Sequence, residues 1–207
     1  MRFYVFLSLA TILLFTGCAQ KEIIPIAPKK PVEVIIDDMP QRTAIVQKAL
    51  KHLNKKDGGD CSGFVNLVNK ESDFAFYNAE ELVNFYEDAR RSLAIYNLLN
   101  DQNRTFDTNP KIGDLVFFAN TVKKYAKQRA EDNITHIGIV TQVDSDHTVH
   151  FIHNTRGRNK IGYLNLDYPT SPQHEGKNVN SYMEKCQTNS HKCLAPSYFS
   201  AYGAISK

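Results

Sequence analysis

The feature that most restricts the fold is a change in hydrophobic spacing part-way along the 207-residue chain. Up to about residue 99, apolar residues recur every three or four positions, as they do on the buried face of a helix. Beyond residue 113, β-branched and aromatic runs are separated by turn-forming residues, which is typical of antiparallel strands. Helices followed by strands predict an α+β domain, with helices packed on an antiparallel sheet.

The expected elements follow from these patterns and from their end signals. Helices are predicted over 41–54, from residue 60 or 61 to about residue 70, and over 79–99. Asp60 is a good N-cap for the second helix, and Asn78 with Glu81 matches a capping box for the third. Strands are predicted over 114–119, 134–143, 148–153 and 160–166, with a last strand over 198–205 and a polar loop over 168–196.

The N-terminus has the form of a secretion signal. Met1 and Arg2 precede an almost wholly apolar stretch, 3–15, which is too short to span a bilayer. The stretch ends at Thr16-Gly17-Cys18, which resembles a bacterial lipobox, with Phe15 where leucine is usual. The resemblance implies cleavage before Cys18 and lipid attachment to its thiol. An ordinary signal peptide or a buried apolar helix is the alternative.

These features predict a signal peptide over 1–17, a tether over 18–40 and a domain over 41–207. The tether is rich in proline and lysine, which favours an extended spacer between domain and membrane. Ala19 and Gln20 follow the lipobox cysteine. By resemblance to the sorting rule of enteric bacteria, they favour the outer membrane, with the domain facing the periplasm.

Charge excludes one class of partner. The net charge is +3 and the pI about 8.6, and basic residues are interspersed with acids. No basic stripe stands out, so nucleic acid is not an expected partner. We expect a monomer with no cofactor.

The four cysteines divide into different roles. Cys186 and Cys193 are near neighbours in the sequence, and an oxidising periplasm favours a disulfide between them. A zinc site with His191 is the alternative, although zinc needs about four ligands and only three candidates cluster there. With Cys18 lipidated, Cys61 is left over, and a leftover thiol is a candidate nucleophile.

Three short stretches carry the candidate chemistry: Asp60-Cys61-Ser62-Gly63-Phe64-Val65, Gly113-Asp114-Leu115-Val116-Phe117-Phe118 and His136-Ile137-Gly138-Ile139-Val140. At a helix N-terminus, free N–H groups and the helix dipole lower the pKa of a thiol such as Cys61. The same N–H groups suit an oxyanion hole, and Ser62 and Gly63 are small enough to admit a substrate carbonyl. His136, at or before the start of an apolar strand, is the expected general base.

The three stretches, in this order, resemble the signature of the NlpC family of cell-wall cysteine peptidases, a branch of the papain-like superfamily. The resemblance spans about residues 41–166. It implies a papain-like α+β fold and cleavage of peptidoglycan stem peptides, typically next to D-glutamate. It places Cys61 at the nucleophile position and His136 at the base position, with no metal.

The residue that orients the base is expected on the next strand. The family places a His, Asn or Gln there, and Phe151-Ile152-His153-Asn154 matches its pattern, which favours His153. His150 and Asn154 are the alternatives. Because side chains alternate along a strand, His150 and His153 cannot both point at His136.

The chain departs from the family in two places. The stretch before the cysteine is shortened to residues 55–59 and lacks a cleft-lining tyrosine, and the connection from Cys61 to Gly113 is long, with the helix near 79–99 inserted. Asp114 is expected to cap a turn, and Phe117 and Phe118 to lie in the core. Rival functions are an amidase of the related CHAP type, acyl transfer to another substrate, and a silent lipoprotein that only binds peptidoglycan.

Overall fold

A computed structural model describes residues 39–73, 75–128, 130–183 and 190–205. The helices are α1 (Met39–Lys51), α2 (Cys61–Glu71), α3 (Ala79–Leu82) and α4 (Arg91–Asp101). Short 3-10 turns are η1 (Val83–Phe85), η2 (Lys123–Gln128), η3 (His191–Cys193) and η4 (Ala195–Ser197). The strands are β1 (Thr105–Phe106), β2 (Leu115–Ala119), β3 (Ile134–Val143), β4 (Val149–Thr155), β5 (Arg158–Leu164), β6 (Gln173–His174), β7 (Lys177–Asn178) and β8 (Phe199–Gly203).

An antiparallel sheet is the centre of the domain. Six strands form it in the order β1-β8-β2-β3-β4-β5, and β6 and β7 form a separate two-stranded ribbon. Neighbouring pairs in the main sheet are antiparallel throughout. The last strand, β8, enters between β1 and β2, so the C-terminal segment completes the sheet that the earlier strands begin.

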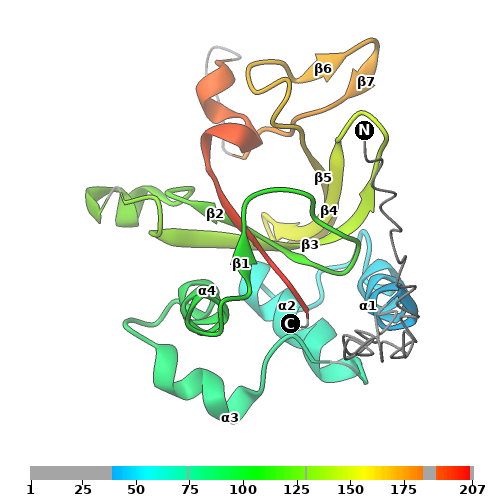
Figure 1. Ribbon diagram of the computed structural model, residues 1–207. Helices are drawn as coiled ribbons and strands as arrows, with labels where there is room; N and C mark the ends of the chain where they lie inside the picture. Colours follow the sequence, from blue (N-terminus) through cyan, green and yellow to red (C-terminus); the bar gives the residue numbers. More distant parts are fainter. Residues whose placement is uncertain (1–38, 74, 129, 184–189, 206–207) are drawn as a thin grey trace, which may run out of the picture. The chain divides into compact units, whose positions relative to one another are not determined.

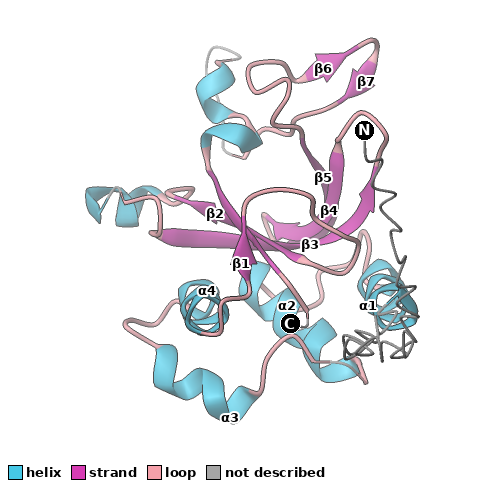
Figure 2. Cartoon of the chain, in the orientation of Figure 1, coloured by secondary structure: helices cyan, strands magenta, loops and turns pink. Residues whose placement is uncertain are grey.

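Each face of the sheet is covered (Figures 1 and 2). Helices α1, α2 and α4 lie on one face, and the segment that carries β6, β7 and η4 lies on the other. The helix-side core includes Phe64, Ile95 and Phe117, whereas the opposite core includes Phe118 and Phe151. Phe117 and Phe118 are fully buried, as the sequence predicted. The α+β class and the antiparallel sheet are confirmed.

Most predicted elements are found within a few residues of their expected bounds. The helix expected over 79–99 is wrong as one continuous element, because the chain leaves the helical conformation between Tyr86 and Arg90. Asp88 Oδ1 accepts from the Arg90 amide at 2.8 Å, and the Arg90 guanidinium donates to Asn133 Oδ1 at 2.5 Å. This contact with a residue 43 positions away stabilises the break, and sequence spacing alone does not reveal it.

The N-terminal predictions lie mostly outside the described residues. The signal peptide over 1–17, Cys18 and the tether up to residue 38 are not described, and α1 begins at Met39, two residues before the expected domain start. Within the part of the chain that the structure describes, no helix has the length and apolar character needed to cross a membrane.

A buried ion pair joins the first helix to the sheet. Arg42 on α1 donates to Asp114 Oδ1 at 2.6 Å and to the Ile112 carbonyl at 3.0 Å, and both charged side chains are almost fully buried. Asp114 Oδ2 also accepts from the Lys111 amide at 2.8 Å, which is the expected turn cap. Asp114 therefore has a second role that the sequence did not indicate, which is to neutralise Arg42.

Removal of the Asp114 carboxylate should strongly destabilise the domain. Asp114→Ala removes this carboxylate from the buried Arg42 guanidinium, which costs on the order of 3–5 kcal/mol in the free energy of unfolding. Urea unfolding followed by circular dichroism measures it. Asp107→Ala, at an exposed aspartate, is the control and should change that energy by less than about 0.5 kcal/mol. Equal effects of the two changes would contradict a structural role for this ion pair.

Candidate functional site

The entry into α2 is held by its own N-cap and by two glycines. Asp60 Oδ1 accepts from the Gly63 amide at 2.7 Å and from the Ser62 hydroxyl at 3.0 Å. The Gly58 carbonyl crosses directly over Gly63, where an added Cβ would lie 2.0 Å from that oxygen. Gly58 itself has φ +86° and packs on the backbone of Phe64. The loop before the helix therefore lies flat on its first turn.

Cys61 is the first residue of this helix and a free thiol. It packs partly against the helix-side core. Burial, together with the negative charge of Asp60, raises the pKa of Cys61 to about 11, while the backbone N–H groups of Ile137, Ser62 and Cys61 lower it. The sequence predicted a lowered thiol pKa. The structure gives the opposite direction, because burial outweighs the helix N-terminus in this resting state.

His136 and His153 form a close pair on adjacent strands. His136 Nε2 lies 2.6 Å from His153 Nδ1, and the two rings meet edge to face. Burial lowers the pKa of His136 to about 4, although the charge of Asp60 acts in the other direction. Burial and the positive charges of His136 and Lys160 hold the pKa of His153 well below its usual value. Both imidazoles are therefore neutral near pH 7.

One backbone contact links the thiol to the histidine pair. The Ile137 amide acts on the Cys61 thiol, and His136 is the residue before Ile137 on β3. The Asp60 charge affects both Cys61 and His136, so the N-cap carboxylate lies within electrostatic reach of both. The structure thus pairs His136 with His153 and places the Cys61 thiol at the amide of the residue that follows His136.

The two alternatives to His153 have other partners. His150 Nε2 lies 2.8 Å from Asp144 Oδ2, and its ring packs on Tyr163. Asn154 Nδ2 donates to Asn159 Oδ1 at 2.9 Å. Of the three candidates on β4, His153 is the one within hydrogen-bond distance of His136.

Ser62 and Gly63, which were expected to admit a substrate carbonyl, are more covered by the protein than predicted. The Gly63 amide already donates to Asp60, and the space beside Gly63 is filled by the Gly58 carbonyl. Ser62 is 8% exposed and donates its hydroxyl to Asp60. The N–H groups that act on the sulfur come from Cys61, Ser62 and Ile137 instead. The Gly63 amide, already bonded to Asp60, is therefore not available as an oxyanion donor in this structure.

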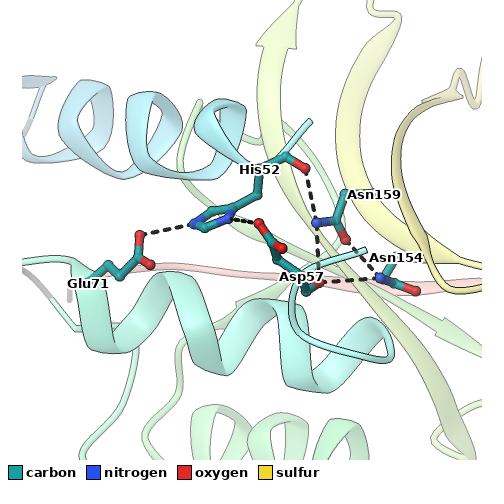
Figure 3. Close-up of polar contacts among 5 residues, drawn as sticks. All are labelled: His52, Asp57, Glu71, Asn154 and Asn159. Atoms are coloured by element: carbon teal, nitrogen blue, oxygen red, sulfur yellow. Dashed lines mark hydrogen bonds and ion pairs between the residues drawn. The ribbon is translucent and has the colours of Figure 1, made fainter. Parts of the chain in front are cut away.

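A buried histidine outside the predicted site supports this loop (Figure 3). His52 lies just after α1, with Nδ1 2.7 Å from Asp57 Oδ2 and Nε2 3.0 Å from Glu71 Oε2. Burial lowers the pKa of His52, but the hydrogen bonds and charges of Asp57 and Glu71 outweigh it, so the net shift is upward. His52 thus connects the loop before Cys61 to the far end of α2.

Two asparagines hold the same loop from the sheet side (Figure 3). Asn159 Nδ2 donates to the His52 carbonyl at 3.1 Å and to the Asp57 carbonyl at 3.3 Å, and Asn154 Nδ2 reaches the Asp57 carbonyl at 3.5 Å. Asn159 is fully buried. Sequence reasoning missed this network because its members are separated by up to 107 residues. The positions of its histidine, aspartate and asparagines in the sequence form no motif that would indicate the network.

Two features of the described residues bear on metal and ligand binding. Among them, no group of three or more His, Cys, Asp or Glu side chains is arranged to hold a metal ion. A hollow of about 210 Å³ lies near Val143, Leu166 and Tyr202, and neither Cys61 nor the histidine pair lines it. Cys193 is disulfide-bonded, whereas Cys186 lies outside the described residues, so their pairing stays a prediction.

Comparison with known proteins adds no assignment. No family model, no curated protein and no solved structure matched this chain.

The thiol of Cys61 should behave as a protonated group over most of the accessible pH range. Alkylation of Cys61 by iodoacetamide should accelerate as the pH rises above 9, because its pKa of about 11 leaves little thiolate at pH 7. Asp60→Asn keeps a capping side chain but removes a negative charge. It should lower the pKa of Cys61 and so shift the pH dependence of the alkylation rate to lower pH. Peptide mapping by mass spectrometry follows this cysteine alone. A rate that is already maximal at pH 6 would show a resting thiolate and contradict this prediction.

His52 should titrate above its ordinary value of 6.5. Because its folded-state pKa is raised, its contribution to stability is complete below about pH 6 and is lost as the pH rises through that pKa. Asp57→Asn removes one carboxylate and should lower the titration midpoint, measured by NMR of the imidazole Cε1–H. Asp167→Asn, at an exposed aspartate elsewhere, is the control and should leave the His52 midpoint unchanged.

Proposed function

We propose that this protein is a cysteine peptidase of papain-like fold that cuts stem peptides of peptidoglycan. The observation that carries the proposal is the arrangement of Cys61, at the start of α2 and beside the Ile137 amide, with His136 hydrogen-bonded to His153. The three motif stretches support the substrate class by their resemblance to the NlpC signature. The lipobox-like stretch ending at Cys18 supports a site of action at the cell envelope, on a membrane anchor.

The histidine pair suits general base chemistry. His136 Nε2 faces His153 Nδ1, so Nδ1 of His136 is the ring nitrogen left for the thiol proton. For His136 to accept the thiol proton at Nδ1, its ring hydrogen must be on Nε2. The Nε2–H group of His136 then donates to His153 Nδ1. His153 then carries its own hydrogen on Nε2, where the lack of a side chain at Gly162 leaves room. In this role His153 selects the tautomer of the base.

The proposed reaction proceeds through a thioester. Cys61 Sγ attacks the carbonyl carbon of the scissile peptide bond as its proton passes to His136 Nδ1. The oxyanion is stabilised by backbone N–H groups at the helix start. The C–N bond then breaks, and the leaving amine takes the proton from His136. A water molecule, deprotonated by His136, attacks the thioester, releases the acid product and restores the thiol.

Both reacting groups are neutral before substrate binds. The raised pKa of Cys61 and the lowered pKa of His136 disfavour a thiolate–imidazolium pair at rest. Proton transfer therefore accompanies attack on the carbonyl, when the negative charge moves from sulfur to an oxygen that accepts backbone hydrogen bonds. The acid limit of activity should follow the lowered pKa of His136, because only neutral imidazole accepts the proton.

Loss of the nucleophile should abolish turnover without unfolding the protein. Purified muropeptides incubated with the wild type should be cut within the stem peptide, as read by mass spectrometry. Cys61→Ser should reduce the rate by at least about a thousandfold. Products split between sugar and peptide would indicate an amidase instead. Equal activity in the wild type and the folded Cys61→Ser variant would refute the proposed nucleophile and favour a binding lipoprotein.

The orienting residue should affect rate more than binding. His153→Ala should lower kcat by on the order of ten- to ten-thousand-fold with little change in KM, because nucleophile and base remain. His153→Asn and His153→Gln should recover part of the rate. His150→Ala is the matched control on the same strand and should stay near wild type, since His150 contacts Asp144 instead. If the His150 variant is the impaired one, the proposed triad is wrong.

A further inference from the structure

A lysine lies next to the histidine pair on the same face of the sheet. In the β4–β5 register, Lys160 is directly opposite His153. Gly162, two residues along β5, lies against the His153 ring, where an added Cβ would be 3.2 Å from Nε2. Residues two apart on a strand share a face. The Lys160 side chain therefore leaves the sheet beside His153, one strand further from β3 and His136.

Lys160 belongs to a group of exposed positive charges. The backbone N–H of Asn159, the residue before Lys160 on β5, donates to the Lys55 carbonyl at 2.8 Å. This bond brings the loop before Cys61 to the same end of the sheet. The cationic patch, as we call this group, consists of Lys55, Lys56, Arg156, Arg158 and Lys160.

The cationic patch has few neutralising partners. In the described part of the chain, none of its five members forms an ion pair; the Arg158 guanidinium donates to the Asn54 carbonyl. The nearby carboxylate of Asp57 is already bonded to His52. The positive charge of Lys160 also lowers the pKa of His153, so its field extends to the candidate site.

We propose that the cationic patch, with Lys160 as the member that lies opposite His153, is a subsite for a carboxylate of the peptide substrate. The inference rests on the proposed cleavage at Cys61. Adjacent strands lie about 4.8 Å apart, and an extended peptide advances about 3.3–3.6 Å per residue. Strand β5 is two strands from β3, about 10 Å, and the Ile137 amide of β3 acts on the Cys61 thiol. About three extended residues cover that span, so one peptide can reach from Lys160 to Cys61. The patch selects acidic peptides over their neutral counterparts.

The test uses two peptides that differ in one group. One is a stem peptide with a free carboxylate beside the scissile bond, and the other is the same peptide with that carboxylate amidated. Lys160→Glu should raise KM for the acidic peptide about tenfold and change kcat by less than about twofold. Lys160→Gln should give a smaller rise. Neither variant should change KM for the amidated peptide by more than about twofold.

A matched control and a binding assay separate this inference from the proposed function. Lys177→Glu makes the same charge change on β7 and should leave KM unchanged. Calorimetry with the Cys61→Ala protein measures binding of both peptides without turnover, so the inference stays testable even if no peptide is cut. Equal loss for both peptides in the Lys160→Glu variant would overturn it. Binding of inorganic phosphate, but not of the acidic peptide, in a Lys160-dependent manner would also overturn it.

Discussion

The candidate site depends on how the chain enters helix α2. The loop before Cys61 packs flat on the first helical turn, because neither Gly58 nor Gly63 has a side chain to hold them apart. Asp60 then caps the helix and places its charge near both Cys61 and His136. One short segment thus sets the position of the thiol and much of the electrostatic field around it.

Contacts from three other elements hold this segment in place. His52 binds Asp57 from the end of α1, and Glu71 binds His52 from the end of α2. Asn159 on β5 donates to the carbonyls of His52 and Asp57. Because these partners come from distant parts of the chain, the loop is ordered only when the helix layer and the sheet are assembled. Stability and site geometry are therefore coupled.

Electrostatics in the site differ from what a helix N-terminus alone suggests. The dipole and the free N–H groups favour a thiolate, but burial and the Asp60 carboxylate oppose it more strongly. The histidine pair is neutral for the same reason, since an imidazolium is poorly solvated there. In the proposed peptidase, a negatively charged sulfur or oxygen and a protonated His136 would therefore exist together only during reaction.

Local patterns in the sequence were sufficient for the fold class, the Asp60 cap, the start of α2 and the burial of Phe117 and Phe118. These features depend on nearby residues, through hydrophobic period and capping chemistry. The pairing of Arg42 with Asp114 and the break in the helix expected over 79–99 arise from contacts many residues apart. The raised pKa of Cys61 also required the tertiary structure, because burial is a property of the assembled domain. The motif resemblance already favoured His153 over His150, and the strand register of the structure places His153 against His136.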